Sequence, residues 1–274
     1  MGINPCVWSD YFSDLSLEQM ISTFQQFGFH HTELSRMFRE NLLNQGDPDK
    51  VGTKVALYCS ENGFSIPQGH LSFQKGLCDN TVLEDLKREI DLFHAIGIRS
   101  AVLHFNGGKL LPEEVRWDKR IVTVKALQEY VKGTPMTLCL ENLGSEPSTH
   151  TVQRLKKIIA TVGEENMGIC LDTGHLHLTN GRGEVEQTQE EFILGAGELL
   201  KAMHVTENNG KNDVHQMPYS ARYGIDWSQV VKALKQINYQ GLFNLEILGE
   251  KNAPMPIREA KLRYIKEMTD YMLR

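Results

Sequence analysis

Four residues with metal-binding side chains each end a short apolar segment of this chain. They are Glu141, Asp172, His204 and Glu246, at the ends of 137–141 (TLCLE), 168–172 (GICLD), 201–204 (KAMH) and 242–246 (LFNLE). Carboxylate and imidazole groups are ligands for hard or borderline divalent ions. If the segments are strands of one parallel barrel, their carboxyl ends meet at one edge. The sequence therefore predicts a divalent metal site at that edge, and an enzyme.

Further ligand-type residues share this placement. Glu33, His70 and His104 end three earlier apolar segments, His175 follows Asp172 by one turn, and Asp213 and His215 lie in the long irregular segment 207–226. Each alone is typical of a hydrogen-bonded structural residue or a helix cap. Their common placement at one edge favours a site. The remaining histidines lack it and are assigned to the surface or to packing: His30, His31, His94, His150 and His177.

Segments with strand character alternate with helical periods along the whole chain. Strands are predicted at 3–8, 31–34, 64–71, 100–105, 137–141, 168–172, 201–204 and 242–246. Helices are predicted at 17–27, 49–62, 82–96, 113–131, 151–162, 187–200, 227–237 and 257–273. Eight such pairs indicate an α/β protein with a closed (β/α)₈ TIM barrel, as a single domain over residues 1–274. A doubly wound open sheet is the alternative, and no Gly-rich phosphate loop follows the first strand to support it.

The alternation of side chains within the later strands supports a closed barrel. Side chains point to opposite faces along a strand, so Cys139 lies on the same face as Glu141. Leu138 and Leu140 lie on the other face. The face that carries the carboxylate is small or polar, as a barrel interior that ends in a site requires. The opposite face is large and apolar, as packing against outer helices requires.

Composition limits the classes of partner. The chain has 274 residues and a formal net charge of −6, which gives no support to a nucleic-acid partner. Its five cysteines form no C-x-x-C pair, which is typical of a reducing compartment and predicts a cytoplasmic protein. No signal peptide or membrane-spanning run is visible. A homo-oligomer is an open alternative.

Several short motifs resemble one known family. They are ENLGS at 141–145, LDTGH at 171–175, HVTE at 204–207, DVHQMP at 213–218, GIDW at 224–227 and LEI at 245–247. Together they resemble the xylose-isomerase-like barrel superfamily, which contains sugar and sugar-phosphate isomerases and epimerases and also endonuclease IV. The resemblance implies one divalent ion, Mn, Mg, Co or Zn, held by Glu141, Asp172, His204 and Glu246.

The resemblance also implies a reaction. A metal-stabilised cis-enediolate would form from an open-chain sugar, with Glu141 and Glu246 removing and returning a proton beside the carbonyl. His175 would bind a substrate hydroxyl, and Arg222 would hold a phosphate or a distal hydroxyl, although a solvated loop arginine is its simpler interpretation. The other residues expected around the substrate are His70, His104, Asp213 and His215.

The endonuclease branch gives the alternative, a zinc-dependent phosphodiesterase that acts at abasic sites. Its trinuclear zinc site has further ligands that correspond to His70, His104, His175, Asp213 and His215. The acidic balance and the absence of arginine-rich loops between the early strands favour the sugar hypothesis. A catalytically inactive sugar-binding barrel is a third class. The complete ligand set argues against it, because clustered carboxylates repel one another without an ion.

Overall fold

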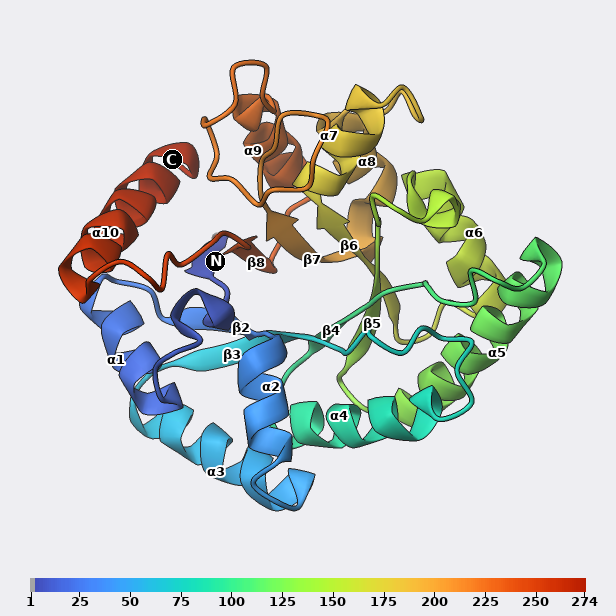
Figure 1. Ribbon diagram of the computed structural model, residues 1–274, viewed down its shortest axis with the longest axis horizontal. Coiled ribbons are helices and arrows are strands. Elements are labelled where there is room, and N and C mark those ends of the chain that lie inside the picture. The colour runs from blue at the N-terminus through green and yellow to red at the C-terminus, as the bar shows by residue number, and fades with distance from the viewer. Residues whose placement is uncertain (1–2) are drawn as a thin grey trace.

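The computed structural model describes residues 3–274 as eight parallel strands with helices between them (Figure 1). The strands are β1 (Asn4–Val7), β2 (His31–Leu34), β3 (Ser65–His70), β4 (Ser100–Leu103), β5 (Thr137–Glu141), β6 (Met167–Asp172), β7 (Leu200–Val205) and β8 (Leu242–Leu245). Their order is β1-β8-β7-β6-β5-β4-β3-β2. At the seam, Thr32 Oγ1 of β2 donates to the Val7 carbonyl of β1 at 2.7 Å. The chain is therefore a nearly closed (β/α)₈ barrel, which confirms the predicted fold.

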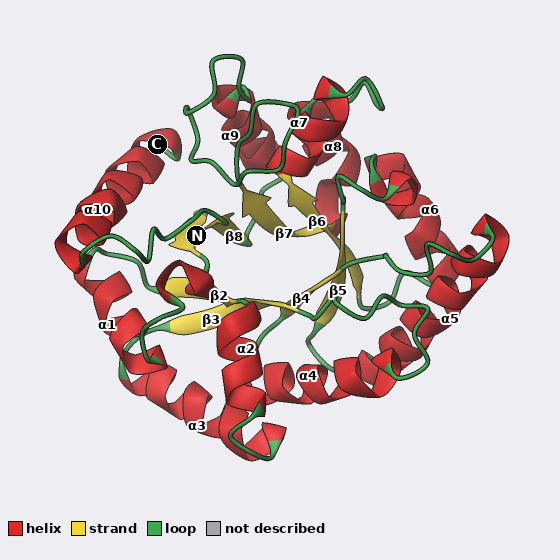
Figure 2. Ribbon diagram, in the orientation of Figure 1, coloured by secondary structure: helices red, strands yellow, loops and turns green. Residues whose placement is uncertain are grey.

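The helices surround the strands as an outer ring (Figure 2). They are α1 (Leu17–Gln26), α2 (Arg36–Leu43), α3 (Pro48–Glu61), α4 (Val82–Ile96), α5 (Glu113–Val131), α6 (Val152–Val162), α7 (Thr173–Gly181), α8 (Gln189–Ala196), α9 (Trp227–Gln236) and α10 (Met255–Met272). In residues 3–274, none of these helices is long and apolar enough to cross a membrane.

Local signals explain most helix boundaries. Ser16 starts α1 with a capping box that includes Gln19, which satisfies free amide groups of the first turn. Gly97 ends α4 in the left-handed region with φ 93°, a conformation that glycine adopts at little cost. The predicted helix 187–200 is too long. It breaks at Gly197, whose φ is 55° and ψ −130°, and Leu200 already belongs to β7.

Two helices were not predicted. In α2 a buried charge interrupts the apolar period: Arg39 is 1% exposed and its Nε lies 3.4 Å from Glu89 Oε1. Helix α7 starts directly after β6 without a loop, because Asp172 is both the last strand residue and the helix cap. Its Oδ1 accepts a hydrogen bond from the His175 amide at 2.7 Å. That helix fixes His175 one turn beyond the strand end.

The core has the two faces predicted from strand alternation. Inside the barrel, Val102, Cys139, Cys170 and Ala202 form a small buried cluster of their own. Outside the strands, Leu138, Leu140, Ile169 and Leu171 join the large cluster shared with the helices. The interior is therefore filled by small side chains, and the bulk of the apolar burial lies between the strands and the helix ring.

Candidate metal centre

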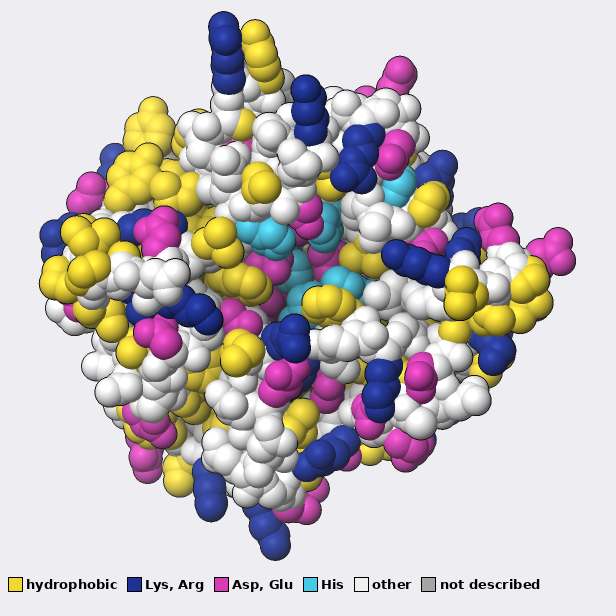
Figure 3. Space-filling model, viewed as in Figure 1, with side chains coloured by type: hydrophobic (Ala, Val, Ile, Leu, Met, Phe, Trp, Pro, Cys, Tyr) yellow, Lys and Arg dark blue, Asp and Glu magenta, His cyan; other side chains and the backbone are white. Residues whose placement is uncertain are grey.

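The carboxyl ends of the strands bring the predicted ligands together. Asp172 of β6 pairs in register with His204 of β7, and His204 pairs with Asn244 of β8, two residues before Glu246. The Glu246 amide continues the ladder by donating to the Val205 carbonyl at 3.2 Å. Figure 3 shows histidine and acidic side chains gathered in a hollow at the centre of this face.

Glu141 lies among four imidazole rings. Its Oε2 is 2.8 Å from His104 Nε2 and 3.4 Å from His70 Nε2. Its Oε1 is 3.2 Å from His175 Nδ1 and 3.4 Å from His204 Nδ1. The Glu141 side chain is 1% exposed, so these rings replace water around it. A carboxylate with neighbours on both oxygens is placed to bridge two groups of ligands.

His204 joins a second set of carboxylates. Its Nδ1 is 3.0 Å from Glu246 Oε2, and its Nε2 is 2.9 Å from Glu33 Oε2. Glu33 in turn accepts a hydrogen bond from Gln68. A carboxylate on one ring nitrogen fixes the tautomer and the orientation of a metal-binding histidine. Glu33 therefore holds His204 so that Nδ1 faces Glu141 and Glu246.

A third group lies at the outer edge of the hollow. His175 Nε2 is 3.2 Å from Asp213 Oδ2, and His215 Nε2 is 3.5 Å from Asp213 Oδ1. The Nδ1 atoms of both rings lie against backbone carbonyls, His175 at 3.0 Å from that of Asn142 and His215 at 2.9 Å from that of Glu246. If both Nδ1 atoms donate there, both Nε2 atoms present lone pairs toward Asp213.

The side chains fit a divalent cation. Ligand atoms converge within 4.8 Å of one another in three overlapping groups: His70, His104 and Glu141; Glu141, Asp172 and His175; Asp172, His204 and Glu246. Asp172 Oδ2 is buried and forms no hydrogen bond within residues 3–274. Buried carboxylate oxygens without donors are costly unless a cation neutralises them.

The two carboxylates of the predicted acid–base pair differ electrostatically. Burial raises the pKa of Glu246 to about 7, although His204 and His215 oppose the shift. Burial acts in the same direction on Glu141, but His104 and His204 outweigh it and hold the pKa of Glu141 well below its usual range. Before any cation binds, Glu246 is therefore the better proton acceptor near neutral pH.

The hollow contains a cavity of about 370 Å³. Its lining includes His70, His104, Glu141, His175, Asp213, His215 and Glu246, together with Phe73, Asn106 and Arg182. Arg222 does not line it, and the Arg222 guanidinium instead lies 5.5 Å from the centre of the Tyr223 ring. Arg182, which directly follows α7, also lines the cavity, although it was not among the predicted site residues. The sequence did not predict α7, so no pattern indicated that Arg182 would lie at this edge of the barrel.

A buried carboxylate organises the loop that carries Asp213 and His215. Glu207 is 1% exposed, and its oxygens accept hydrogen bonds from the Ser220 amide at 2.8 Å and the Ile225 amide at 2.9 Å. Its backbone pairs with Gln216 as an isolated antiparallel bridge. His215 has a φ of 45°, so its placement depends on this loop conformation. Glu207 is therefore a positioning residue for the third group.

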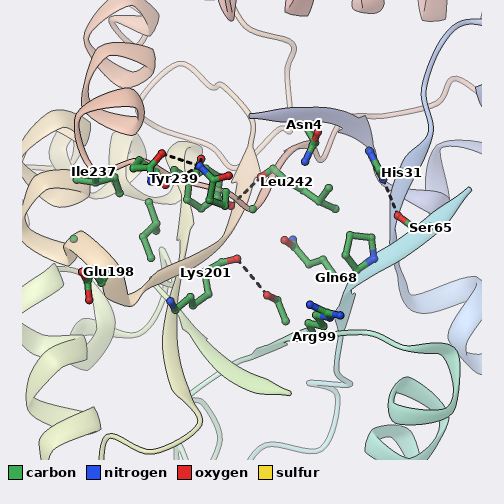
Figure 4. Close-up of a pocket in the computed structure, with 17 residues that line it drawn as sticks. Asn4, His31, Ser65, Gln68, Arg99, Glu198, Lys201, Ile237, Tyr239 and Leu242 are labelled. Carbon is green, nitrogen blue, oxygen red and sulfur yellow. Dashed lines mark hydrogen bonds between the residues drawn. The ribbon is translucent and has the colours of Figure 1, made fainter. Parts of the chain in front are cut away.

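A second cavity, of about 590 Å³, lies at the opposite, amino-terminal end of the barrel (Figure 4). Two of its polar side chains are paired with neighbours: His31 Nδ1 lies 2.7 Å from Ser65 Oγ, and Ser100 Oγ donates to the Lys201 carbonyl at 3.3 Å. The cavity has one carboxylate in its lining, Glu198. No group of ligand atoms converges there in residues 3–274. This space therefore lacks the chemistry of the other end.

Residues 23–268 match the family model described as xylose isomerase-like TIM barrel, and the chain belongs to that family. It is 24% identical over 257 residues to "Putative L-ribulose-5-phosphate 3-epimerase SgbU" of Haemophilus influenzae, covering 87% of this chain and 86% of that protein. It is 23% identical over 169 residues to "Uncharacterized protein y4fM" of Sinorhizobium fredii, covering 60% of this chain and 52% of that protein. It is also 26% identical over 156 residues to "Probable endonuclease 4" of Mycoplasma pneumoniae, covering 53% of each. The chain thus spans about half the length of the last two relatives.

Solved structures of sugar epimerases share the fold. A D-psicose 3-epimerase crystallised in the presence of D-fructose superposes with a TM-score of 0.77 at 17% identity, covering 100% of this chain and 99% of that one. An L-ribulose 3-epimerase gives a TM-score of 0.77 at 17% identity, covering 99% and 94%. At these identities the likeness concerns the fold alone.

Proposed function

We propose that the chain is a metal-dependent isomerase or epimerase of a sugar or sugar phosphate, which moves a proton at a carbon beside a carbonyl. The observation that carries this proposal is the pair of carboxylates around His204. Glu246 Oε2 lies 3.0 Å and Glu141 Oε1 3.4 Å from the same ring nitrogen. Two carboxylates that approach one point from different strands can serve the two faces of a small substrate. The sugar 3-epimerases among the structural neighbours support the same reaction class.

Glu141, Asp172, His204 and Glu246 would hold the ion. Three carboxylates and one imidazole suit Mn, Mg, Co or Zn. When bound, the ion would polarise the carbonyl oxygen of the substrate and favour loss of the neighbouring proton. Asp172 is the least exposed of the carboxylates and also caps α7. It is therefore a ligand rather than a proton carrier.

Glu246 would remove the proton. Burial makes Glu246 the more basic of the two carboxylates in the metal-free chain, and it lines the cavity where a substrate would lie. A bound cation lowers the pKa of nearby carboxylates, so the base would act as a carboxylate at neutral pH. Glu141 approaches the same His204 Nδ1 from the end of β5, at 3.4 Å, and would return the proton.

The surrounding imidazoles would orient the substrate. His104 and His70 hold one oxygen of Glu141, while His175 and His215 line the same cavity. Phe73 stacks on His104 with 4.5 Å between ring centres, so it limits the space beside that ring. In this role the histidines bind hydroxyl groups of a polyol.

A specific observation favours a second candidate, a metal-dependent phosphodiesterase acting at abasic sites in DNA. A proton-transfer site with one ion has no need of the group formed by His70, His104 and Glu141, nor of the group formed by His175, Asp213 and His215. Together they supply donors for further ions. The relative named "Probable endonuclease 4" is consistent with that candidate.

The number of ions and the reaction separate the candidates. We would load purified protein with Mn or Zn, measure the metal content per chain, and incubate it in deuterated water with ketoses and ketose phosphates. The proposal expects deuterium at the carbon beside the carbonyl. A chain that binds several zinc ions, nicks an abasic-site duplex and exchanges no sugar proton would instead belong to the second candidate.

A further inference from the structure

The candidate-site cavity continues past the ligand cluster. Gly144, Ser145 and Arg182 line it and also line a neighbouring space of about 460 Å³, which we call the side cavity. The rest of the side cavity is lined by Pro147, His150, Arg154 and Glu184. The two spaces meet at these three shared residues. A molecule bound at the ligand cluster can therefore extend into the side cavity.

Two arginines give the side cavity its charge. Arg182 donates to the Gly144 and Lys211 carbonyls, each at 3.3 Å, and Arg154 donates to the Pro147 carbonyl at 2.7 Å. These bonds position the guanidinium groups but leave most of their N–H donors free and their charge uncompensated. In contrast, Arg120 is paired with Glu146 at 2.9 Å.

Neither cation has an acidic partner in the structure. Across residues 3–274, no carboxylate oxygen lies within 4.0 Å of Arg154 or Arg182. Glu184, the one acid in the lining, faces His150, with 3.6 Å between its Oε2 and the ring Nδ1. Both arginine side chains are exposed to the side cavity and give it a local positive charge in a chain whose net charge is −6.

The wall between the arginines is neutral and buried. His150 is 3% exposed, and its Nε2 has no hydrogen-bond partner in residues 3–274. Burial lowers the pKa of His150; Glu184 and Glu146 oppose this shift, and the charges of Arg154 and Arg182 add to it. His150 lines the side cavity together with both arginines. Ser145 is exposed and adds a hydroxyl donor at the junction of the two spaces.

We propose that the side cavity binds an anionic group, a phosphate or carboxylate, at the end of the substrate away from the reacting carbons, with Arg182 and Arg154 as its partners. This rests on the proposed function and narrows it: the substrate is an acidic sugar derivative rather than a neutral ketose. The planar fork of donors on arginine matches both groups in a bidentate manner. A phosphate accepts more hydrogen bonds than a carboxylate, so a sugar phosphate is the favoured ligand.

The first experiment compares substrates. Metal-loaded wild type, Arg182→Gln, Arg154→Gln and Arg182→Lys are assayed with matched pairs of one ketose, phosphorylated and not, and with sugar acids of the same length. Hydrogen bonds to charged groups contribute about tenfold to a hundredfold in affinity. We expect each Gln variant to raise KM by that factor more for the phosphorylated member than for the neutral one, and Arg182→Lys to restore part of the loss.

The matched control removes a cation from the same helix. Lys156 lies on α6 two residues after Arg154, is exposed as Arg154 is, and lines neither cavity. Lys156→Gln therefore changes the net charge of α6 as Arg154→Gln does, and should leave the preference for phosphate unchanged. An equal loss in Lys156→Gln would reduce the effect to general electrostatic attraction and overturn the inference. A larger loss with sugar acids than with phosphates would assign the cavity to a carboxylate.

The second experiment is independent of turnover. Inorganic phosphate is titrated into metal-free protein by calorimetry, so that no ion competes for it. We expect wild type to bind phosphate and the Arg154→Gln, Arg182→Gln double variant to lose about tenfold or more in affinity.

The two experiments together separate the anion site from the proposed function. If phosphate binding depends on the arginines while no ketose reacts, the anion site stands and the proposed function fails. If ketoses react but the arginine variants keep the wild-type preference between phosphorylated and neutral ketoses, the proposed function stands and the anion site fails. Selective loss of abasic-duplex nicking in the variants would assign the arginines to a nucleic-acid backbone and overturn the inference.

Discussion

The two ends of the barrel differ in a way that cavity size does not predict. The amino-terminal cavity, at about 590 Å³, is larger than the carboxy-terminal one, at about 370 Å³. Its lining contains a single carboxylate, Glu198, and no group of metal-ligand atoms converges there in residues 3–274. At the other end, the buried Asp172 Oδ2 has no hydrogen-bond partner among residues 3–274, and three groups of ligand atoms converge. Unsatisfied, converging atoms identify the chemical end of the molecule better than volume does.

The difference follows from the direction of the strands. Parallel strands place every carboxyl end at one edge, so the residues that end the apolar segments meet there. At the amino-terminal edge the chain enters the strands from short connections such as Asn238–Gly241, whose Tyr239 hydroxyl donates back to the Leu242 carbonyl at 3.0 Å.

The largest expected effect is the loss of turnover in Glu246→Gln. The amide has almost the same shape as the carboxylate but cannot accept the proton, and loss of a general base typically costs about 10² to 10⁴ in rate. The matched change at the other end is Glu198→Gln, since Glu198 is the carboxylate that lines the amino-terminal cavity. Deuterium incorporation from solvent measures both. Equal rates in Glu246→Gln and wild type would show that Glu246 is not the base.

Removing the metal should lower the stability of the protein, because the carboxy-terminal end of the barrel loses its bound ion. A cation that binds only the folded chain at a hundred times its Kd stabilises it by about 2.7 kcal/mol. Chelation should remove this stabilisation, and Mn, Co, Mg or Zn should restore it. Thermal unfolding with and without metal measures the difference. No shift with any of the four ions would contradict the candidate metal centre.

Asp172→Asn tests whether the metal-dependent shift in the unfolding temperature comes from the candidate metal centre. Asparagine caps a helix as well as aspartate does, so α7 keeps its start while one anionic ligand is lost. We expect the metal-dependent shift to shrink in this variant. His31→Gln, at the amino-terminal end, should retain the full shift, because His31 contacts Ser65 and none of the candidate ligands.

The sequence predicted the barrel and the edge at which ligands gather because both depend on local patterns. The apolar segments that end in Glu141, Asp172 and His204 predict the strands, the face on which each of these side chains lies and the edge at which they meet. The contact between Glu33 and His204 joins residues 171 positions apart, and no local pattern specifies it. Arg182 was missed because α7 follows β6 without a loop. Arg222 lies in the loop whose conformation depends on hydrogen bonds to the distant Glu207, and its side chain lies against Tyr223 instead of the cavity.

Glu33→Gln should weaken metal binding although it leaves all four candidate ligands unchanged. Glu33 accepts from His204 at 2.9 Å, and loss of such a partner typically costs about 10- to 100-fold in metal affinity. Gln68 also donates to Glu33, so the carboxylate is held from two sides. Metal titration of the chelated protein measures the change. An unchanged affinity would mean that packing alone orients His204, and would remove Glu33 from the account of the site.

The smallest expected effect is on the pH dependence of the free energy of unfolding. Histidines at the two ends of the barrel should change this dependence in opposite directions. In the metal-free protein, Asp213 and Glu246 outweigh burial and raise the pKa of His215 from 6.5 to about 10. The folded chain then holds this proton where the unfolded chain has lost it. The stabilisation is therefore complete below pH 6.5 and disappears as the pH rises to about 10. Since Asp213 is 37% exposed, we expect only about 0.2–1 kcal/mol.

Double measurements at the two ends isolate these contributions. The free energy of unfolding of wild type minus that of His215→Gln should be largest at slightly acidic pH and should shrink as the solution is made alkaline. At the amino-terminal end, burial lowers the pKa of His31, so the folded chain holds fewer protons there than the unfolded chain. The corresponding difference for His31→Gln should therefore grow as the pH rises toward 6.5 and stay constant above it. Parallel slopes in the two variants would show that His215 is not held by Asp213 and Glu246, and that the third group of ligands does not form in the metal-free chain.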